Sequence, residues 1–281
     1  MEMRKSYAKI NLGLSVVRKT RRNYHKLKMI MCQIDLYDEV YFYESDEILV
    51  ETDKKVCEME QNLCYKVAAY LKKKYDVPQG VKIFIKKNIP DGGGLGGGSS
   101  NAATVLKYLN KKWNLGLSDK KLKKIGFMFG CDIPFFIDGN ISYVYSYGEK
   151  MKGIKVIKKV DDILLVVPGF KNSTKTIFEN HEIVSGGSRK VCELIKGLKK
   201  GDYKNFVFND LERTANEVSQ HKMFLIMNKL RNAGCNNVIM TGSGSTLVCF
   251  MNDQDDAAVL CNKIKKELAD CKVVASTLKM Y

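Results

Sequence analysis

The chain has 281 residues, of which 45% are hydrophobic and four are proline, and it carries 47 Lys and Arg against 31 Asp and Glu. This composition excludes disordered and fibrous proteins, and the length suffices for two domains. The nine cysteines show no C-x-x-C pair and no zinc-type spacing with histidine, and the apolar runs are far shorter than a membrane span. We therefore expect a soluble protein of a reducing, cytoplasmic compartment.

The positive charge is distributed along the chain. The formal net charge is +16, but the lysines come mostly in short runs such as 72–74, 111–112 and 199–200. Such runs are typical of solvated helix faces, and no basic motif interleaved with aromatic residues accompanies them. We expect no nucleic-acid partner and no membrane partner. A basic RNA-binding protein is an alternative that only the net charge supports.

The first predicted strand covers residues 6–17, where apolar and polar residues alternate with a period of two. Lys9 and Asn11 are two residues apart, so their side chains share one face of this strand. Two polar groups fixed on a rigid strand are suited to catalysis, whereas a solvated outer face would give the same pattern. Both interpretations stay open at this point.

Further strands and a helix come next. Residues 33–51 predict additional strands, and apolar residues at four-residue spacing predict an amphipathic helix over residues 59–75. Residues 81–86 again alternate with a period of two, and residues 102–109 show helical spacing. The glycine-rich stretch between these two segments therefore joins a strand to a helix.

This glycine-rich stretch has the chemistry of an anion-binding turn. Its six glycines let the backbone reach positive φ and approach a bulky partner closely. The first N–H groups of the following helix lack internal partners, and the helix dipole adds partial positive charge, so a phosphate fits there. Ser99 and Ser100 could cap the helix, bond a phosphate oxygen or face a bound Mg²⁺. The candidate phosphate-binding residues are Pro90, Asp91, Gly92, Gly93, Gly94, Leu95, Gly96, Gly97, Gly98, Ser99 and Ser100.

Three other interpretations of this stretch are weaker. A Walker loop needs a lysine directly before its Ser or Thr, and Gly98 stands there instead. The spacing Gly92-x-Gly94-x-x-Gly97 matches the dinucleotide fingerprint, but the acidic residue expected about 20 positions later is only Asp119, in what looks like a helix start. A flexible linker does not usually pass into a helix with core periodicity.

A second candidate site follows the helix predicted between Ser118 and Gly130. Asp132 stands there within the segment Gly-Cys-Asp-Ile-Pro-Phe-Phe. A carboxylate among apolar residues is costly unless it is paired, and Lys9 is an obvious partner. The alternative is an Asp that caps a turn after a helix.

The second half of the chain predicts an α+β domain. Strands are predicted at residues 142–147, 163–167, 237–240, 245–251 and 272–278, and helices from Ser173 onward, over 209–233 and over 255–268. The loop Thr241-Gly242-Ser243-Gly244 joins two of these strands and could be a plain hairpin turn. We expect domains at residues 1–155 and 156–281, the second with a ferredoxin-like order of elements.

Four separated blocks resemble one family. In chain order they are the strand around Lys9, the glycine-rich stretch, the Asp132 segment and the loop at 241–244, and together they resemble the GHMP kinases (galactokinase, homoserine kinase, mevalonate kinase and relatives). The resemblance implies a two-domain α+β fold with an N-terminal ATP-binding α/β domain and a C-terminal ferredoxin-like domain. It implies ATP and Mg²⁺ as cofactors, Asp132 as the catalytic base and Lys9 as a second catalytic residue.

Within the family, the chain most resembles the kinases that phosphorylate a cytidine diphosphate alcohol in isoprenoid precursor synthesis. In these, a Tyr-His pair belongs to the cytidine pocket and an aromatic residue stacks on the cytosine. One departure is Arg22-Asn23 in place of the Asp-Gly that usually precedes the pair. The resemblance implies Asn11, Tyr24, His25, Phe178, Thr241 and Gly242 as substrate-binding residues and Asn62 and Lys87 as adenine-pocket residues.

Read without the family, His25 would more often be a surface or structural histidine, and Phe178 would more often belong to the core. Two alternatives therefore remain. One is another GHMP kinase, of homoserine or mevalonate type, which would lack a cytidine pocket. The other is a non-catalytic nucleotide-binding protein on the same scaffold. The presence of Lys9 and Asp132 favours an enzyme.

Overall fold

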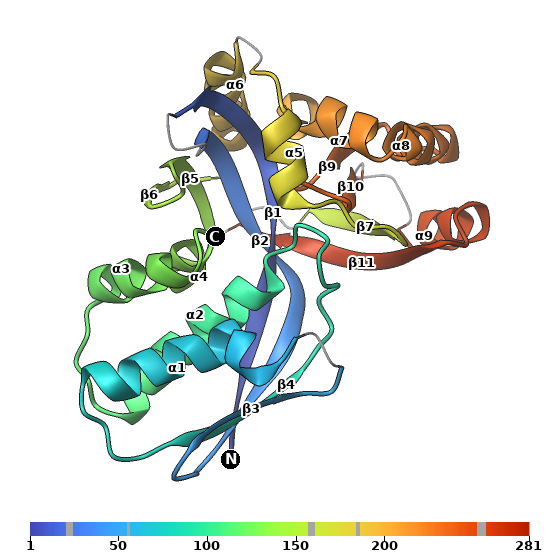
Figure 1. The fold of residues 1–281 in the computed structure, drawn as a ribbon. Coiled ribbons are helices and arrows are strands. Elements are labelled where there is room, and N and C mark those ends of the chain that lie inside the picture. The colour runs from blue at the N-terminus through green and yellow to red at the C-terminus, as the bar shows by residue number, and fades with distance from the viewer. Residues whose placement is uncertain (21–24, 55–56, 157–160, 184–185, 252–256, 281) are drawn as a thin grey trace. The chain divides into compact units, whose positions relative to one another are not determined.

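The computed structural model describes residues 1–20, 25–54, 57–156, 161–183, 186–251 and 257–280 (Figure 1). The chain divides into two compact units. Unit 1 holds Met1–Ala8, Leu36–Asp91 and Gly96–Gly139, and unit 2 holds Lys9–Asp35, Gly92–Leu95 and Asn140–Tyr281. Two long strands, β1 (Glu2–Lys19) and β2 (His25–Tyr43), contribute residues to both units. The boundary near residue 155 between the two domains expected from the sequence stays a prediction.

Unit 1 combines a small sheet with helices. In the sheet, β3 (Ile48–Thr52) runs parallel to β4 (Val81–Lys86), and β4 pairs antiparallel with residues 39–43 of β2. The helices are η1 (Met59–Gln61, a 3-10 turn), α1 (Leu63–Lys74), α2 (Gly97–Lys112), α3 (Asp119–Phe129) and α4 (Ile133–Asp138). Helix α2 packs against both α1 and α4.

The local sequence explains where α1 and α2 begin. Asn62 caps α1, because its Oδ1 accepts a hydrogen bond of 2.9 Å from the N–H of Cys64. Helix α2 begins after Gly96, whose φ of +71° is a left-handed conformation that glycine adopts without strain. Its buried face includes Ala102, Ala103 and Leu106. The strand-to-helix turn predicted for the glycine-rich stretch is therefore confirmed.

Unit 2 contains a ferredoxin-like sheet. The strands β7 (Asp162–Pro168), β9 (Asn237–Met240), β10 (Leu247–Phe250) and β11 (Cys271–Lys279) pair antiparallel in the order β11-β7-β10-β9. Helix α9 (Ala257–Glu267) lies between β10 and β11 in the chain and contacts β7 and β11. The ferredoxin-like architecture expected for the second half of the chain is confirmed.

The other elements of unit 2 carry the segments that surround this sheet. β5 (Ile141–Ser146) pairs with residues 27–32 of β2 and with β6 (Lys150–Gly153), and β8 (Phe208–Asn209) runs parallel to residues 13–14 of β1. The remaining helices are α5 (Thr174–Asn180), α6 (Gly187–Lys200), η2 (Lys204–Phe206), α7 (Glu212–Val218) and α8 (Lys222–Ala233).

The prediction of a single helix over residues 209–233 is wrong, because the structure has two helices there. Helix α7 ends at Val218, and Gln220 and His221 have φ values of +54° and +65° before α8 begins. The Asn216 carboxamide stabilises this break, since its Oδ1 accepts a hydrogen bond of 3.0 Å from the N–H of Phe224 in the first turn of α8. Apolar spacing continues through the break, so periodicity alone does not reveal it.

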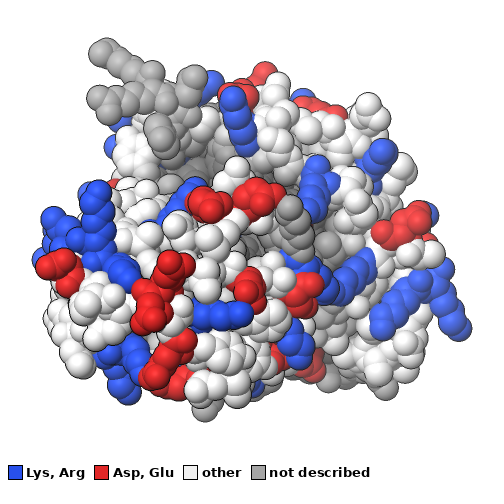
Figure 2. Space-filling view, turned by 60° about the horizontal axis from the view of Figure 1, so that its bottom comes forward, with Lys and Arg blue, Asp and Glu red and all other residues white. Residues whose placement is uncertain are grey.

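Charge on the surface is mixed. On the face shown in Figure 2, Lys and Arg side chains are interspersed with Asp and Glu side chains. Some charged helix residues form exposed pairs one turn apart, such as Arg189 with Glu193 at 2.9 Å and Arg213 with Glu217 at 3.0 Å. Within the described part of the chain, no helix is long and apolar enough to cross a membrane.

Candidate active site

The glycine-rich loop presents an anion-binding turn. Gly92, Gly94 and Gly96 have φ values of +73°, +79° and +71°, so alternate residues of the loop are left-handed. The first hydrogen bond of α2 runs from the N–H of Ser100 to the oxygen of Gly96, at 2.9 Å. The earlier N–H groups of the helix are available to an external acceptor, as is usual at a helix N-terminus.

Two consecutive glycines of this loop lie in close contact with the 241–246 segment of unit 2. A Cβ on Gly93 would lie 2.4 Å from the Thr246 hydroxyl, and a Cβ on Gly94 would lie 2.5 Å from the Thr241 carbonyl oxygen. Real Cβ atoms do not approach that closely, and Gly94 also needs its positive φ. These contacts place the Thr241-Gly242-Ser243-Gly244 loop directly against the glycine-rich loop.

The two serines of the loop differ in their surroundings. Ser100 is buried, and its hydroxyl donates to the Tyr7 carbonyl oxygen at 2.6 Å and accepts from the Ser6 hydroxyl at 2.8 Å. Ser99, one residue earlier in the first turn of α2, is half-buried. Ser100 therefore holds strand β1 within unit 1, and Ser99 is the better placed of the two to meet a phosphate oxygen or a metal ion.

Lys9 and Asn11 form a buried polar pair on β1. Lys9 is 4% exposed and donates from its Nζ to Asn11 Oδ1 at 2.8 Å, and Asn11 is fully buried. The backbone holds this pair in place, because the N–H of Lys9 donates to the Leu95 oxygen at 3.0 Å and the N–H of Asn11 donates to Thr241 Oγ1 at 2.9 Å. The burial rules out a solvated outer face, so the catalytic interpretation gains support.

Asp132 stands directly before the short helix α4 in unit 1. It is half-buried, while the next residues, Ile133, Pro134 and Phe135, are buried. The Asp132 side chain makes no capping hydrogen bond to α4. Its role as a catalytic base stays a prediction.

His25 and Phe178 come together in unit 2, as the cytidine-pocket interpretation requires. Their ring centroids are 5.2 Å apart with an interplanar angle of 36°. Phe178 is only half-buried, because its neighbour Ile177 supplies the core contact of α5. His25 is buried, and its Nε2 has no hydrogen-bond partner among the described residues. Tyr24, the other predicted member of this pocket, lies outside the described residues.

Burial lowers the pKa of His25 below its usual value, and the positive charge of Lys19 and the neighbouring His181 lower it further. The ring is therefore neutral at physiological pH. A neutral imidazole has one donor and one acceptor, which suits the edge of a pyrimidine base.

Both predicted adenine-pocket residues have side chains with structural partners in unit 1. The Asn62 oxygen caps α1, as described above. The Lys87 ammonium, only 10% exposed, is ion-paired with Asp38 and donates to Asn101 Oδ1 at 3.0 Å. The Asn62 oxygen and the Lys87 ammonium therefore already have partners within unit 1. The role of these two residues toward adenine stays a prediction.

Sequence reasoning missed two residues that fix the loops. Asp38 is fully buried, and its carboxylate accepts hydrogen bonds of 2.8 Å from the N–H groups of both Asn88 and Ile89, just before the glycine-rich loop. In unit 2, Asn209 Nδ2 donates to the oxygens of Met240 at 2.7 Å and Gly242 at 2.8 Å. The sequence pattern could have revealed Asp38. Residues 36, 38, 40 and 42 share one face of β2, and Asp38 is the one polar residue among these four.

Glu212 supports the same 241–244 loop from α7. Its Oε1 accepts a hydrogen bond of 2.8 Å from the N–H of Met240. Burial raises the pKa of its carboxyl from 4.5 to about 7, against the opposing effects of this hydrogen bond and of the charges on Arg231 and Lys190. The folded protein therefore binds this proton more tightly than the unfolded chain does.

We predict that Glu212→Gln makes folding less dependent on pH. Because the folded-state pKa is raised, the stability that comes from protonated Glu212 is complete below pH 4.5 and is lost as pH rises through about 7. That loss is on the order of 3 kcal/mol. Thermal unfolding at pH 5 and pH 8 should show a smaller fall in Tm for the variant than for the wild type. The control is Glu217→Gln on the exposed side of α7, and equal pH dependence of Glu212→Gln and the wild type would contradict the prediction.

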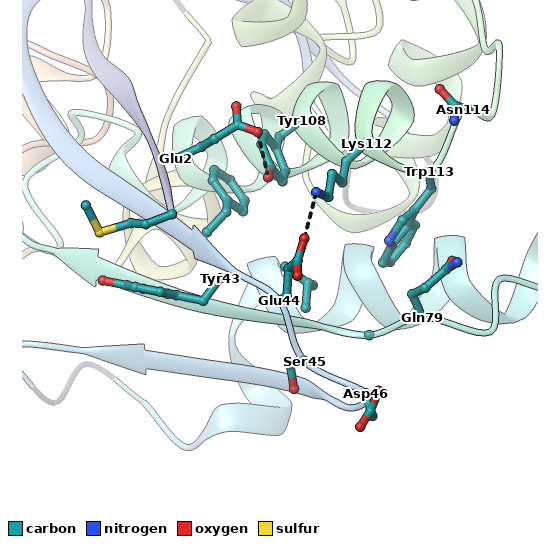
Figure 3. Close-up of a pocket in the computed structure, with 14 residues that line it drawn as sticks. Glu2, Tyr43, Glu44, Ser45, Asp46, Gln79, Tyr108, Lys112, Trp113 and Asn114 are labelled. Carbon is teal, nitrogen blue, oxygen red and sulfur yellow. Dashed lines mark hydrogen bonds and ion pairs between the residues drawn. The ribbon is translucent and has the colours of Figure 1, made fainter.

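A separate cavity of about 510 Å³ lies in unit 1 (Figure 3). None of the predicted site residues lines it. Four of its polar groups form two pairs: Lys112 lies 3.3 Å from Glu44, and the Tyr108 hydroxyl donates to Glu2 at 3.4 Å. The ring of Phe42 stacks on Tyr108 at 3.7 Å. These contacts give the lining residues of the cavity structural roles in unit 1.

The comparisons with known proteins agree with this geometry. Residues 62–140 match the GHMP kinases N terminal domain, and residues 194–270 match the GHMP kinases C terminal domain. The chain belongs to the GHMP kinase family, and the two-domain GHMP fold predicted from the sequence is confirmed.

Several relatives and one solved structure share a more specific name. The chain is 37% identical over 273 residues to a Clostridium beijerinckii protein named 4-diphosphocytidyl-2-C-methyl-D-erythritol kinase, with 95% of this chain and 96% of that one covered. A Thermodesulfovibrio yellowstonii protein of the same name is 39% identical over 261 residues, with 90% of each chain covered. The crystal structure of a 4-(cytidine 5'-diphospho)-2C-methyl-D-erythritol kinase superposes with a TM-score of 0.82 at 25% identity and full coverage of both chains.

Proposed function

We propose that this protein is an ATP-dependent kinase that phosphorylates the 2-hydroxyl of 4-diphosphocytidyl-2-C-methyl-D-erythritol, a step of non-mevalonate isoprenoid precursor synthesis. The observation that carries the proposal is the 37–39% identity to kinases of that name over at least 90% of the chain. The pairing of His25 with Phe178 in unit 2 supports the cytidine part of the substrate. We also propose that the enzyme is cytoplasmic, in keeping with its composition.

We propose that the glycine-rich loop and the first turn of α2 bind the ATP phosphates. The exposed N–H groups there offer hydrogen bonds and partial positive charge to the phosphate oxygens. Mg²⁺, when bound, would neutralise charge that develops on these oxygens. In the described part of the chain, no three His, Cys, Asp or Glu side chains are grouped to hold a metal ion. The Ser99 hydroxyl fits such an ion, because Mg²⁺ commonly keeps water and phosphate as most of its ligands.

The reaction itself needs an oriented hydroxyl and a proton acceptor. Asp132 would accept the proton of the substrate hydroxyl. The oxygen of that hydroxyl then bonds to the γ-phosphorus, while the bond between this phosphorus and the ADP oxygen breaks. The Lys9 ammonium would stabilise negative charge on the reacting oxygens, and Asn11 would hold the ammonium through its 2.8 Å hydrogen bond. Thr241 and Gly242 would shape the substrate side of this site.

The cytidine would be bound in unit 2. The ring of Phe178 is half-buried and offers a face for stacking. The Nε2 of neutral His25 has no hydrogen-bond partner among the described residues and offers a hydrogen bond to the edge of the base. Tyr24 would complete the pocket. We propose these three residues as the source of selectivity over the alcohols of other GHMP kinases.

The experiment that tests the proposal measures ADP release from ATP and Mg²⁺ with three alcohols supplied in parallel: 4-diphosphocytidyl-2-C-methyl-D-erythritol, homoserine and mevalonate. We expect turnover with the cytidyl substrate alone. Turnover with another alcohol would retain the kinase mechanism and reject the cytidine pocket. An absence of turnover with all three would favour a non-catalytic nucleotide-binding protein.

A further inference from the structure

Lys171 lies beside the glycine-rich loop, although the two are far apart in the sequence. The residue follows β7 and precedes α5, and its side chain is exposed. A Cβ on Gly92 would lie 2.8 Å from Lys171 Cδ and 3.4 Å from its Nζ. Gly92 is the first left-handed glycine of the loop, with φ of +73°. Both residues belong to unit 2. The structure therefore places an ammonium group at the start of the proposed phosphate-binding loop.

The neighbours of Lys171 fix its backbone. The carbonyl oxygen of Phe170 accepts a hydrogen bond of 2.5 Å from the Ser245 hydroxyl. On the other side, Asn172 Nδ2 donates to the Ser243 oxygen at 3.4 Å, and the Thr174 and Ser243 hydroxyls lie 2.8 Å apart. The 241–246 segment that supplies these bonds is the same one that packs on Gly93 and Gly94. The position of Lys171 beside the loop is thus a consequence of the fold and does not depend on its own side chain.

The chemistry of phosphate loops indicates what this ammonium does. A Walker loop carries its own lysine, which reaches the β- and γ-phosphates, and this chain has Gly98 at that place. Lysine acts on phosphates as a flexible point charge, so a lysine from another segment can provide the same charge. We propose that Lys171 binds the β- or γ-phosphate oxygens of ATP, from outside the loop motif. This inference rests on the proposed use of the loop for ATP.

The aliphatic part of Lys171 packs along Gly92. Lys171→Met keeps that aliphatic part and removes the charge, and Lys171→Arg keeps the charge. The matched control is Lys175→Met, because Lys175 lies on the same segment and is 81% exposed. Calorimetric titration of the full-length variants with ATP, ADP, AMP and CDP, in the presence of Mg²⁺ and without the alcohol substrate, measures each nucleotide separately.

We expect Lys171→Met to weaken ATP binding about 10-fold, with AMP binding unchanged and with Lys171→Arg and Lys175→Met close to wild type. An equal loss for ADP assigns the contact to the β-phosphate, and unchanged ADP binding assigns it to the γ-phosphate. Unchanged ATP affinity in Lys171→Met would overturn the proposal, as would an equal loss for AMP or a loss confined to CDP. The experiments distinguish failure of the Lys171 inference from failure of the proposed kinase function. Wild-type protein that binds ATP but phosphorylates none of the alcohols leaves the Lys171 inference intact, whereas wild-type protein that does not bind ATP overturns both.

Discussion

Replacement of Asp132 by Asn is expected to lower kcat by about 10²–10⁴-fold, the range of general-base catalysis. The carboxamide has nearly the shape of the carboxylate but cannot accept the proton of the substrate hydroxyl. The KM for ATP should stay close to that of the wild type, because the proposed ATP contacts come from the glycine-rich loop. Steady-state ADP release at saturating substrate gives kcat, and a titration with ATP gives KM.

The control for this variant is an aspartate at the other end of the same short helix. Asp138 is the last residue of α4, and its carboxylate is ion-paired with Lys123 at 2.5 Å. Asp138→Asn changes the charge of the same helix by the same amount and should keep wild-type turnover. A kcat near the wild-type value in Asp132→Asn would reject this residue as the base and leave the rest of the proposal standing.

The largest effect on stability is expected from Asp38→Asn. The Asp38 carboxylate is fully buried and is the counter-charge of the Lys87 ammonium, which is itself 10% exposed. Asn in its place leaves that ammonium buried without an opposite charge, which typically costs about 3–5 kcal/mol. For a chain of this size we expect Tm to fall by roughly 10 °C. Thermal unfolding followed by circular dichroism measures the difference.

A double variant separates the charge from the hydrogen bonds. In Asp38→Asn with Lys87→Met, the stranded ammonium is gone, while the Asn oxygen can still accept from the N–H groups of Asn88 and Ile89. Most of the lost stability should return. If the double variant unfolds as early as the single one, the carboxylate's bonds to the backbone are the important ones, and the ion pair is secondary.

The parts of the site that the sequence predicts are those whose chemistry is local. Glycines at a strand-to-helix turn have few explanations besides close approach, and the loop in the structure has the expected positive φ values. Two-residue spacing was enough to predict that Lys9 and Asn11 share a face. Residue spacing did not decide whether that face was buried, since burial depends on the 241–246 segment, more than 200 residues away.

The residues that sequence reasoning missed act through distant partners. Asp38 meets backbone groups at positions 88 and 89, and Asn209 meets oxygens at positions 240 and 242. Nothing in the neighbourhood of Asn209 or Lys171 distinguishes them from ordinary surface residues. The break between α7 and α8 was missed for a related reason, because its left-handed residues are Gln220 and His221 and no glycine marks the break.

The division of the chain has a consequence for synthesis on the ribosome. The backbone passes from one unit to the other after Ala8, Asp35, Asp91, Leu95 and Gly139, so neither unit is a continuous segment. Residues 33–34 of β2 emerge early, yet they pair with residues 278–279 of β11. Unit 2 therefore cannot close its sheet while translation is under way. Truncation near residue 139, which would look harmless on a linear map, would leave the early strands without the partners that cover them.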